Sequence, residues 1–243
     1  MTQPPHGSTG VEPFRIHATP AELDDLRARL DATHWPEAPE QAGWSLGTDV
    51  THLRELAAYW ADEFDWPAHE TALARLPRFH TRVEDVGIAF LHARAVAPTG
   101  PALPLVLCHG WPDSSWRYEK ALPLLTDPGA HGGDPADAFD VVVPDMPGCG
   151  LLTRYWLTGT IGSSMCLYIA NAAIPHEQHS RKVEVPSGFA RFPGDTLHPP
   201  RAWLERTANV VRLADLERGG HFAPFEEPEL YAQELREFFR PYR

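Results

Sequence analysis

Cysteine and basic residues are scarce in this chain of 243 residues. Its three cysteines, Cys108, Cys149 and Cys166, lie far apart, which argues against a disulfide framework and is typical of proteins in a reducing compartment. Lysine and arginine number 21 against 33 aspartates and glutamates, so the formal net charge is −12. This balance argues against proteins that bind nucleic acid or anionic membranes through a basic surface. We therefore expect a cytoplasmic protein with no nucleic-acid partner.

Long hydrophobic runs are also missing. The longest, at residues 104–108 and 141–143, are far too short to cross a bilayer. The first ten residues have neither a basic nor an apolar region, so residues 1–12 are predicted to be a disordered tail rather than a signal peptide, and no membrane anchor is expected. The 25 prolines, about twice the usual share of about 5%, exclude a coiled coil or another long-helix repeat.

The first structured segment that the sequence predicts is helical and covers residues 13–76. Thr19 and Glu22 form a capping box, after which Leu23, Leu26 and Leu30 fall on one helical face. Apolar residues at helical spacing recur between residues 53 and 76 and predict two further helices. Ahead of the first helix, residues 14–18 alternate apolar and polar and predict a short strand. We expect residues 13–76 to form a helical appendage ahead of a sheet.

Strand patterns begin after this segment. Alternation at residues 79–83 and 88–91 predicts a hairpin. Continuous apolar runs at 104–108 and 139–144 predict buried strands, with a helix at 116–125 between them. The alternation of strand and helix repeats after residue 180, and fully apolar strands of this kind are typical of a parallel sheet covered on both faces. The fold class is therefore α/β with a mostly parallel sheet.

The predicted strand at 104–108 runs directly into His109, Gly110, Trp111 and Pro112. Open α/β sheets place their sites at the carboxyl ends of strands. Glycine allows a sharp turn there, and free backbone N–H groups can face a developing oxyanion. The alternative is a simple turn between strand and helix.

Asp195 and His221 follow the strands predicted near residues 183–185 and 210–213. An acid followed by a histidine is the order in which α/β-hydrolases arrange these two groups, and a histidine on a Gly-Gly turn is exposed enough to act as a general base. Either residue alone is weak evidence, because turn aspartates and exposed histidines are usually only solvated. Together, on successive strand ends, they predict a hydrolytic site.

A stretch at residues 155–168 carries aromatic residues at helical spacing. The phenol of Tyr168 could donate a hydrogen bond to a leaving oxygen, whereas Tyr155 and Trp156 are better interpreted as helix core. Metal and cofactor sites are not indicated: His176 and His179 have no third ligand nearby, and neither a dinucleotide fingerprint nor a phosphate loop occurs.

Taken in order, these motifs resemble the epoxide hydrolases of the α/β-hydrolase fold, in the branch of the microsomal and juvenile-hormone enzymes. The resemblance extends from residue 12 nearly to the end of the chain and rests on segments 13–76, 109–112, 155–168, 185–195 and 218–229. It implies that residues 13–76 form that branch's N-terminal domain. Residues 77–150 and 181–243 would then be two parts of an incomplete hydrolase core, and 151–180 a remnant of the cap.

The resemblance also implies roles for single residues. His109, Gly110, Trp111 and Pro112 correspond to the oxyanion-hole motif, and Tyr168 corresponds to a tyrosine that assists ring opening. Asp195 is then the acid that orients His221, the histidine that activates water. The implied reaction converts a small hydrophobic epoxide to a vicinal diol without a cofactor, which suggests epoxide metabolism and detoxification.

The nucleophile of that family is missing from this sequence. It is an aspartate on a Gly-x-Asp-x-Gly elbow, and no such elbow, nor one with serine or cysteine in its place, occurs anywhere. Asp113 and Asp145 do not lie on a strand–elbow–helix, and a thiol triad of Cys149 with the histidine and acid has nothing to activate it. We therefore expect little or no activity from this chain alone. The alternative is a non-catalytic remnant or internally deleted gene product.

The deletion also affects the predicted sheet. In the implied parent fold, two strands lie between the strand at 104–108 and the strand at 183–185, and their loss leaves two half-sheets with open edges. We expect the halves to close, so that 183–185 pairs in parallel with 104–108, because closure would bury both apolar edges. Edges that stay open would favour self-association. A contact not shaped for its packing predicts cavities and marginal stability.

Overall fold

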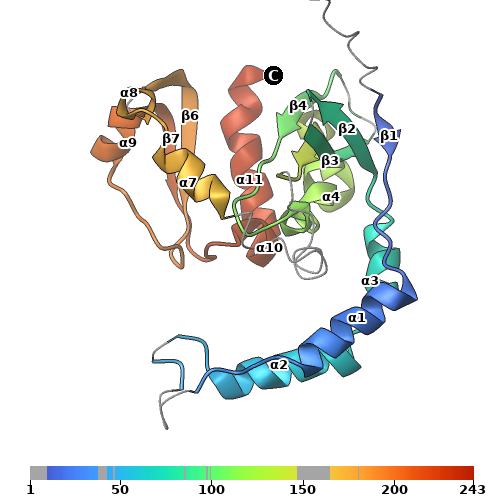
Figure 1. The fold of residues 1–243 in the computed structure, drawn as a ribbon. Helices are drawn as coiled ribbons and strands as arrows, with labels where there is room; N and C mark the ends of the chain where they lie inside the picture. Colours follow the sequence, from blue (N-terminus) through green and yellow to red (C-terminus); the bar gives the residue numbers. More distant parts are fainter. Residues whose placement is uncertain are drawn as a thin grey trace, which may run out of the picture.

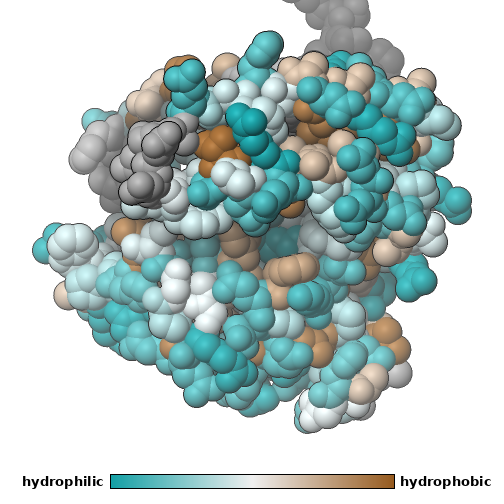
Figure 2. All heavy atoms as spheres, turned by 90° about the horizontal axis from the view of Figure 1, so that it is seen from below, coloured by the Kyte–Doolittle hydropathy of each residue, from teal (hydrophilic) through white to brown (hydrophobic). Residues whose placement is uncertain are grey.

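The computed structural model describes residues 10–37, 43–45, 47–84, 86–96, 98, 100–146, 165–179 and 181–243. Two sheets lie on either side of the C-terminal helix, and the N-terminal helices extend away below them (Figure 1). The face seen in Figure 2 is mostly hydrophilic, with hydrophobic side chains scattered singly and in small groups, as the net charge of −12 suggests. Within these residues, no helix is both long and apolar enough to cross a membrane.

Three helices make up the N-terminal part: α1 (Pro20–Asp31), α2 (Val50–Asp62) and α3 (Trp66–Leu73). The capping box predicted for the first helix is present, because Thr19 accepts from the Glu22 N–H and the Glu22 side chain accepts from the Thr19 N–H. α1 and α2 pack side by side and bury Leu26, Leu30 and Ala61. The prediction of three helices in this segment is confirmed. The short strand predicted at residues 14–18 is wrong, because the strand here covers only Glu12–Pro13 and the Ala18 N–H donates to the Glu70 carboxylate instead of to a neighbouring strand.

The larger sheet has the strand order β1-β2-β3-β5-β4. Its members are β1 (Glu12–Pro13), β2 (Arg78–Val83), β3 (Val86–Ala93), β4 (Leu103–Val106) and β5 (Phe139–Pro144). The predicted hairpin is present as the antiparallel pair β2–β3, and the two apolar strands β4 and β5 pair in parallel. β3 joins the hairpin to β5 in antiparallel orientation. The sheet is therefore mixed.

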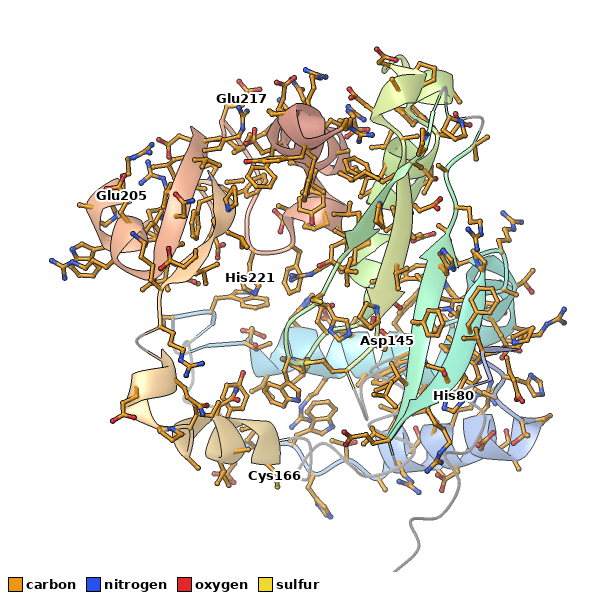
Figure 3. All side chains as sticks on the ribbon, turned by 90° about the horizontal axis from the view of Figure 1, so that it is seen from above. His80, Asp145, Cys166, Glu205, Glu217 and His221 are labelled. Carbon is orange, nitrogen blue, oxygen red and sulfur yellow. The ribbon has the colours of Figure 1, made fainter. Side chains whose placement is uncertain are left out.

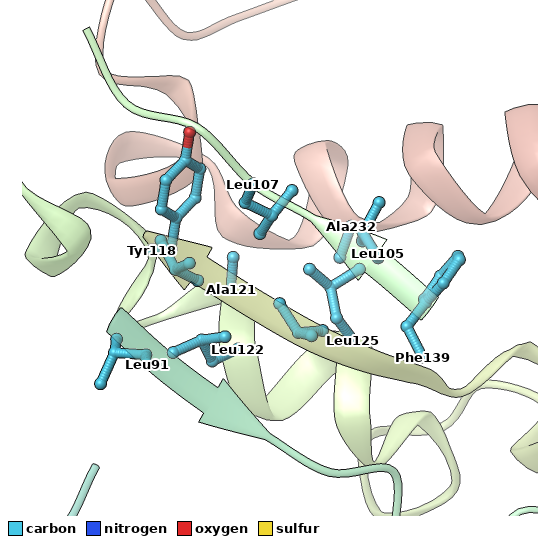
Figure 4. Close-up of a cluster of buried hydrophobic side chains, with 11 residues drawn as sticks. Leu91, Leu105, Leu107, Tyr118, Ala121, Leu122, Leu125, Phe139 and Ala232 are labelled. Atoms are coloured by element: carbon cyan, nitrogen blue, oxygen red, sulfur yellow. The ribbon is translucent and has the colours of Figure 1, made fainter. Parts of the chain in front are cut away.

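The main hydrophobic core lies between this sheet and the helices that cover it. Leu91, Phe139, Val141 and Val143 of the strands are fully buried, together with Leu125 of α4 (Ala121–Thr126) (Figure 4). Short 3-10 turns complete the connection between β4 and β5: η1 (Ser115–Tyr118), η2 (Pro128–His131) and η3 (Pro135–Asp137). The apolar strands β4 and β5 thus contribute to the buried core, as the sequence predicts.

The helix expected at residues 116–125 is divided into η1 and α4. Pro123 explains the division. Its ring clashes with the carbonyl four residues before it and it has no N–H to donate, so proline is tolerated only in the first turn of an α-helix. An α-helix that contains Pro123 must therefore begin shortly before it, and α4 begins at Ala121.

The smaller sheet contains two parallel strands, β6 (Val183–Arg191) and β7 (Ala208–Asp215), joined through α9 (Arg201–Thr207). Two short helices precede it along the chain, α7 (Cys166–Ala172) and α8 (His176–His179). Leu204, Ala208 and Val210 form its own small core. The strand–helix–strand order predicted after residue 180 is confirmed.

The C-terminal helix α11 (Pro228–Phe239) contacts both sheets. It is preceded by α10 (Ala223–Glu226) and followed by η4 (Arg240–Tyr242). Beyond α11, Arg240 Nη2 lies 2.7 Å from Asp137 Oδ2, in the connection before β5. Toward the smaller sheet, Glu234 Oε2 accepts a hydrogen bond of 2.9 Å from Arg212 Nη2 on β7. The C-terminal segment thus fastens the two sheets to each other through side chains.

The expected closure of the two half-sheets is wrong. Among the described residues, β4 pairs only with β5, and β6 pairs only with β7. The helix between them accounts for the separation. α11 packs Leu235 and Phe239 against the main core, and β6 lies directly on it at Gly188, where a Cβ atom would come within 2.6 Å of the Phe238 ring. Moving β6 beside β4 would break these contacts.

Candidate functional site

Asp195 and His221 are brought together by the loops that follow β6 and β7. Gly194 and Gly220 form a parallel bridge beyond the strand ends, and the Gly194 N–H donates to the Gly219 carbonyl at 2.9 Å. Gly219 has a φ of +98°, a conformation that L side chains rarely adopt. The two loops are therefore held in register, and His221 Nδ1 lies 3.0 Å from Asp195 Oδ1. The predicted contact between them is confirmed.

The electrostatics of this pair suit a base exposed to water. The hydrogen bond from His221 lowers the pKa of Asp195, and the Thr196 N–H, which donates to Asp195 Oδ1 at 2.7 Å, lowers it further. Asp195 thus remains a carboxylate that orients the imidazole through Nδ1, which leaves Nε2 as the nitrogen to accept a proton. The side chain of His221 is 61% exposed, so water can reach it.

Figure 3 shows His221 between the β6–β7 pair and the larger sheet. The segment that carries it is attached to the loop region after β4 by Arg117, whose Nη2 donates to the His221 carbonyl at 3.2 Å. Asp113 in turn lies 2.5 Å from Arg117 Nε. The two parts of the candidate site are therefore in contact through Arg117, whose partly buried ion pair with Asp113 sequence reasoning did not identify.

His109 at the end of β4 points into the protein. Its side chain is fully buried, with Nδ1 2.7 Å from the Gly110 carbonyl and Nε2 3.3 Å from Asp145 Oδ1. Burial alone would lower the pKa of His109, but the hydrogen bonds to Asp145 and Gly110 and the nearby carboxylates outweigh it and raise the pKa. His109 thus anchors the loop of residues 109–112. The oxyanion role of His109, Gly110, Trp111 and Pro112 stays a prediction.

Asp145 belongs to a buried polar cluster that the sequence did not reveal. It accepts from the Ser115 N–H at 2.7 Å and from Ser115 Oγ at 3.2 Å, and Arg78 Nη1 lies 3.5 Å from its second oxygen. Arg78 was missed because an arginine on a strand usually faces solvent. With its side chain 2% exposed and every oxygen engaged, Asp145 cannot attack a substrate. Asp113, paired with Arg117, is also structural.

Tyr168 lies on α7 with its ring against Trp111. The two ring centroids are 5.2 Å apart and the planes meet at 84°, an edge-to-face contact. The structure thus brings the predicted ring-opening tyrosine to the predicted oxyanion loop, and the Tyr168 side chain is exposed. Its role in ring opening stays a prediction.

Other proposed residues are not placed. Cys149, Tyr155 and Trp156 lie outside the described residues, and so do the side chains of His176 and His179. Among the side chains that are described, no group of three or more histidine, cysteine, aspartate or glutamate residues is arranged to hold a metal ion.

Comparison with known proteins identifies the family. The family model "Epoxide hydrolase N terminus" matches residues 11–118. "Epoxide hydrolase 1" of Oryctolagus cuniculus is 34% identical to this chain, in an alignment that covers 94% of the chain and 88% of the relative. The chain belongs to the epoxide hydrolase family. A "Putative epoxide hydrolase" of Stigmatella aurantiaca is 26% identical, with 96% and 86% covered.

The fold is shared with solved epoxide hydrolases. The juvenile hormone epoxide hydrolase of Bombyx mori superimposes with a TM-score of 0.85 at 19% identity, covering 97% of this chain and 95% of that chain. An Aspergillus niger epoxide hydrolase superimposes with a TM-score of 0.74 at 17% identity. The predicted α/β-hydrolase fold is therefore confirmed.

The alignments also contain long gaps. The match to the Oryctolagus cuniculus enzyme extends over 401 positions and that to the Stigmatella aurantiaca protein over 381, although this chain has only 243 residues. Long stretches of both relatives therefore have no counterpart here. This agrees with the absence of a nucleophile elbow from the sequence.

Proposed function

We propose that this epoxide hydrolase homologue keeps the water-activating part of the reaction and lacks the nucleophile, so that it does not turn over epoxides on its own. The observation that carries the proposal is the His221–Asp195 contact of 3.0 Å, in a chain that has no elbow and whose Asp113 and Asp145 are engaged elsewhere. The substrate class by ancestry is a small hydrophobic epoxide, and a role in detoxification in the cytoplasm remains part of the proposal.

The complete reaction would have two stages. A carboxylate attacks one epoxide carbon and forms an ester, the carbon–oxygen bond breaks toward oxygen, and Tyr168 transfers its phenol proton to that oxygen, which becomes an alcohol. Water then attacks the ester carbonyl and gives a proton to His221 Nε2, which passes it to the departing alkoxide. The diol leaves, and the proton of the released carboxylic acid returns to the Tyr168 oxygen, which restores the carboxylate. This reaction uses no metal or cofactor. Here the second stage has its base, but the first has no attacking group.

We expect a large loss of catalytic rate. Covalent catalysis that loses its nucleophile typically loses a factor of about 10⁴ or more. A residual route is direct attack by water activated at His221 on an epoxide that Tyr168 polarises. Both groups are exposed, so substrate and water can reach them.

Hydrolysis of styrene oxide or stilbene oxide by the purified chain tests the proposal. We expect no diol above the uncatalysed background, in either the natural chain or a His221→Gln variant. Turnover by the natural chain that disappears in His221→Gln would contradict the proposal and establish the direct route.

A further inference from the structure

A groove separates the free edges of β4 and β6. Its cavity volume is about 260 Å³. The residues that line it come from β4 and the loop after it, from β6 and from α11, and include Leu105, Val106, Leu107, Phe189, Leu235 and Phe238. The groove is therefore built from both half-sheets, with the connecting helix as part of its wall.

The lining favours an uncharged occupant. Almost every lining residue is apolar, and Val106 is 61% exposed although it lies on a strand of the main sheet. Among the described residues that line the groove, Glu234 alone is charged, and both its oxygens contact the Arg212 guanidinium. A charged group placed here would lose its hydration without gaining a partner.

The edge of β4 adds a backbone contribution. The Leu107 N–H donates to the Val142 carbonyl of β5 at 2.9 Å, and successive residues of a strand alternate in direction. The N–H and C=O of Val106 therefore point away from β5, toward the groove. β4 has no strand on this side among the residues described. An extended segment can hydrogen-bond to such an edge while its side chains contact the apolar wall.

The separation of the halves matches that of complete relatives. One superposition on the Bombyx mori enzyme covers 97% of this chain with a TM-score of 0.85, so both half-sheets are included in the shared fold. The relatives have long stretches that this chain lacks. The two sides of the groove are joined by α11, which packs on the main core and contacts β7 through Glu234 and Arg212.

We propose that this groove binds, from a separate polypeptide, an extended apolar segment that carries a strand and an aspartate elbow, and that this assembly restores the missing nucleophile. The inference rests on the proposed function, because the occupant supplies the carboxylate and the present chain supplies His221 and Asp195. The supplied aspartate would form the ester with the epoxide carbon, and water activated at His221 would release it.

Co-expression tests the binding. The probe is the stretch of Oryctolagus cuniculus Epoxide hydrolase 1 that has no counterpart in the alignment with this chain. It is produced as a separate tagged fragment together with the full 243-residue chain. We expect a one-to-one complex, and a Val106→Asp substitution should weaken it by roughly tenfold or more, because a carboxylate loses hydration in the groove. Val83→Asp is the matched control, since Val83 is 58% exposed at a distant strand end.

Failure of the fragment to bind, or equal binding to the Val106→Asp and Val83→Asp variants, would overturn the proposal. A dimer of the present chain that excludes the fragment would overturn it in favour of a second copy as the occupant. Unfolding midpoints of both variants show whether Val106→Asp keeps its fold. If it unfolds, protection of the Val106 amide from hydrogen exchange by the fragment replaces it, and absence of protection contradicts the proposal.

Measuring the activity of the complex tests the binding groove and the proposed function separately. We expect the complex to hydrolyse styrene oxide, and the same complex with His221→Gln to be at background. A stable complex that depends on Val106 but has no activity would confirm the binding groove and contradict the proposal that His221 and Asp195 remain a working pair.

Discussion

The two sheets of this molecule bury their strands very differently. In the larger sheet, Leu91, Val141 and Val143 have no exposed surface, whereas in the smaller sheet Val185 is 65% exposed and Val211 50%. The larger sheet forms its core with α4 and α11, but the smaller one buries only Leu204, Ala208 and Val210 in a small core of its own. The larger sheet therefore carries most of the buried apolar surface, and the smaller sheet carries little.

The polar groups differ in the same way. The larger sheet buries Asp145 with Arg78, while the smaller sheet carries Asp215 with Arg191, a pair in which the carboxylate side chain is 68% exposed. Buried pairs contribute strongly when one partner is lost, whereas exposed pairs contribute little. The comparison therefore predicts where substitutions are costly.

The largest effect is expected for Asp145→Asn. Removing one partner of a buried ion pair typically costs about 3–5 kcal/mol, because the other charge is left uncompensated. Asp215→Asn should cost far less, because solvent screens an exposed ion pair. Urea unfolding of both variants measures the free energies. Equal losses would contradict the distinction between the sheets.

A smaller but substantial effect is expected for Leu125→Ala. A fully buried leucine replaced by alanine loses about 2–5 kcal/mol, because a cavity remains in the packed core. Leu204→Ala in the small core of the other sheet should cost less, because fewer neighbours surround it and the site can relax. The same urea experiment compares them, and a larger loss for Leu204→Ala would reverse the ranking of the two cores.

His109→Gln should lower the free energy of unfolding by about 1–3 kcal/mol below pH 6, the usual cost of an unsatisfied buried hydrogen bond. The pKa of His109 is raised in the folded protein. Its contribution is therefore complete below the unfolded value of about 6.5 and is lost as the pH rises through the folded value. Unfolding measured from pH 5 to pH 9 should show this decline in the natural chain but not in the variant. A decline of equal size in the variant would exclude His109 as its source.

The smallest effect is expected for Asp195→Asn in the exposed pair. The pKa of Asp195 is lowered by His221, so its contribution is present above the unfolded value of about 3.9 and is lost as the pH falls through the folded value. We expect no more than about 1 kcal/mol at pH 7, because both side chains are partly solvated. Thr196→Ala, which keeps the carboxylate, serves as control. A loss in Asp195→Asn that is the same at pH 7 and pH 2 would contradict the electrostatic origin.

The local features of the fold could be predicted from the sequence. The apolar runs of β4 and β5, the capping box of α1 and the order of Asp195 and His221 depend on neighbouring residues or on a rule that holds for many sheets. The separation of the half-sheets could not, because it depends on contacts between residues about a hundred positions apart, such as Arg240 with Asp137. The buried position of Arg78 likewise depends on Asp145, from a different strand region.

Hydrogen exchange at β4 tests most directly the claim that the half-sheets stay apart. The Leu107 amide donates to β5, whereas the Val106 amide points to the open edge. We predict that the purified chain protects Leu107 strongly while Val106 exchanges at least tenfold faster, close to the rate of an exposed amide. Equal, strong protection of both amides in the monomer would show that another strand covers this edge and would contradict the account.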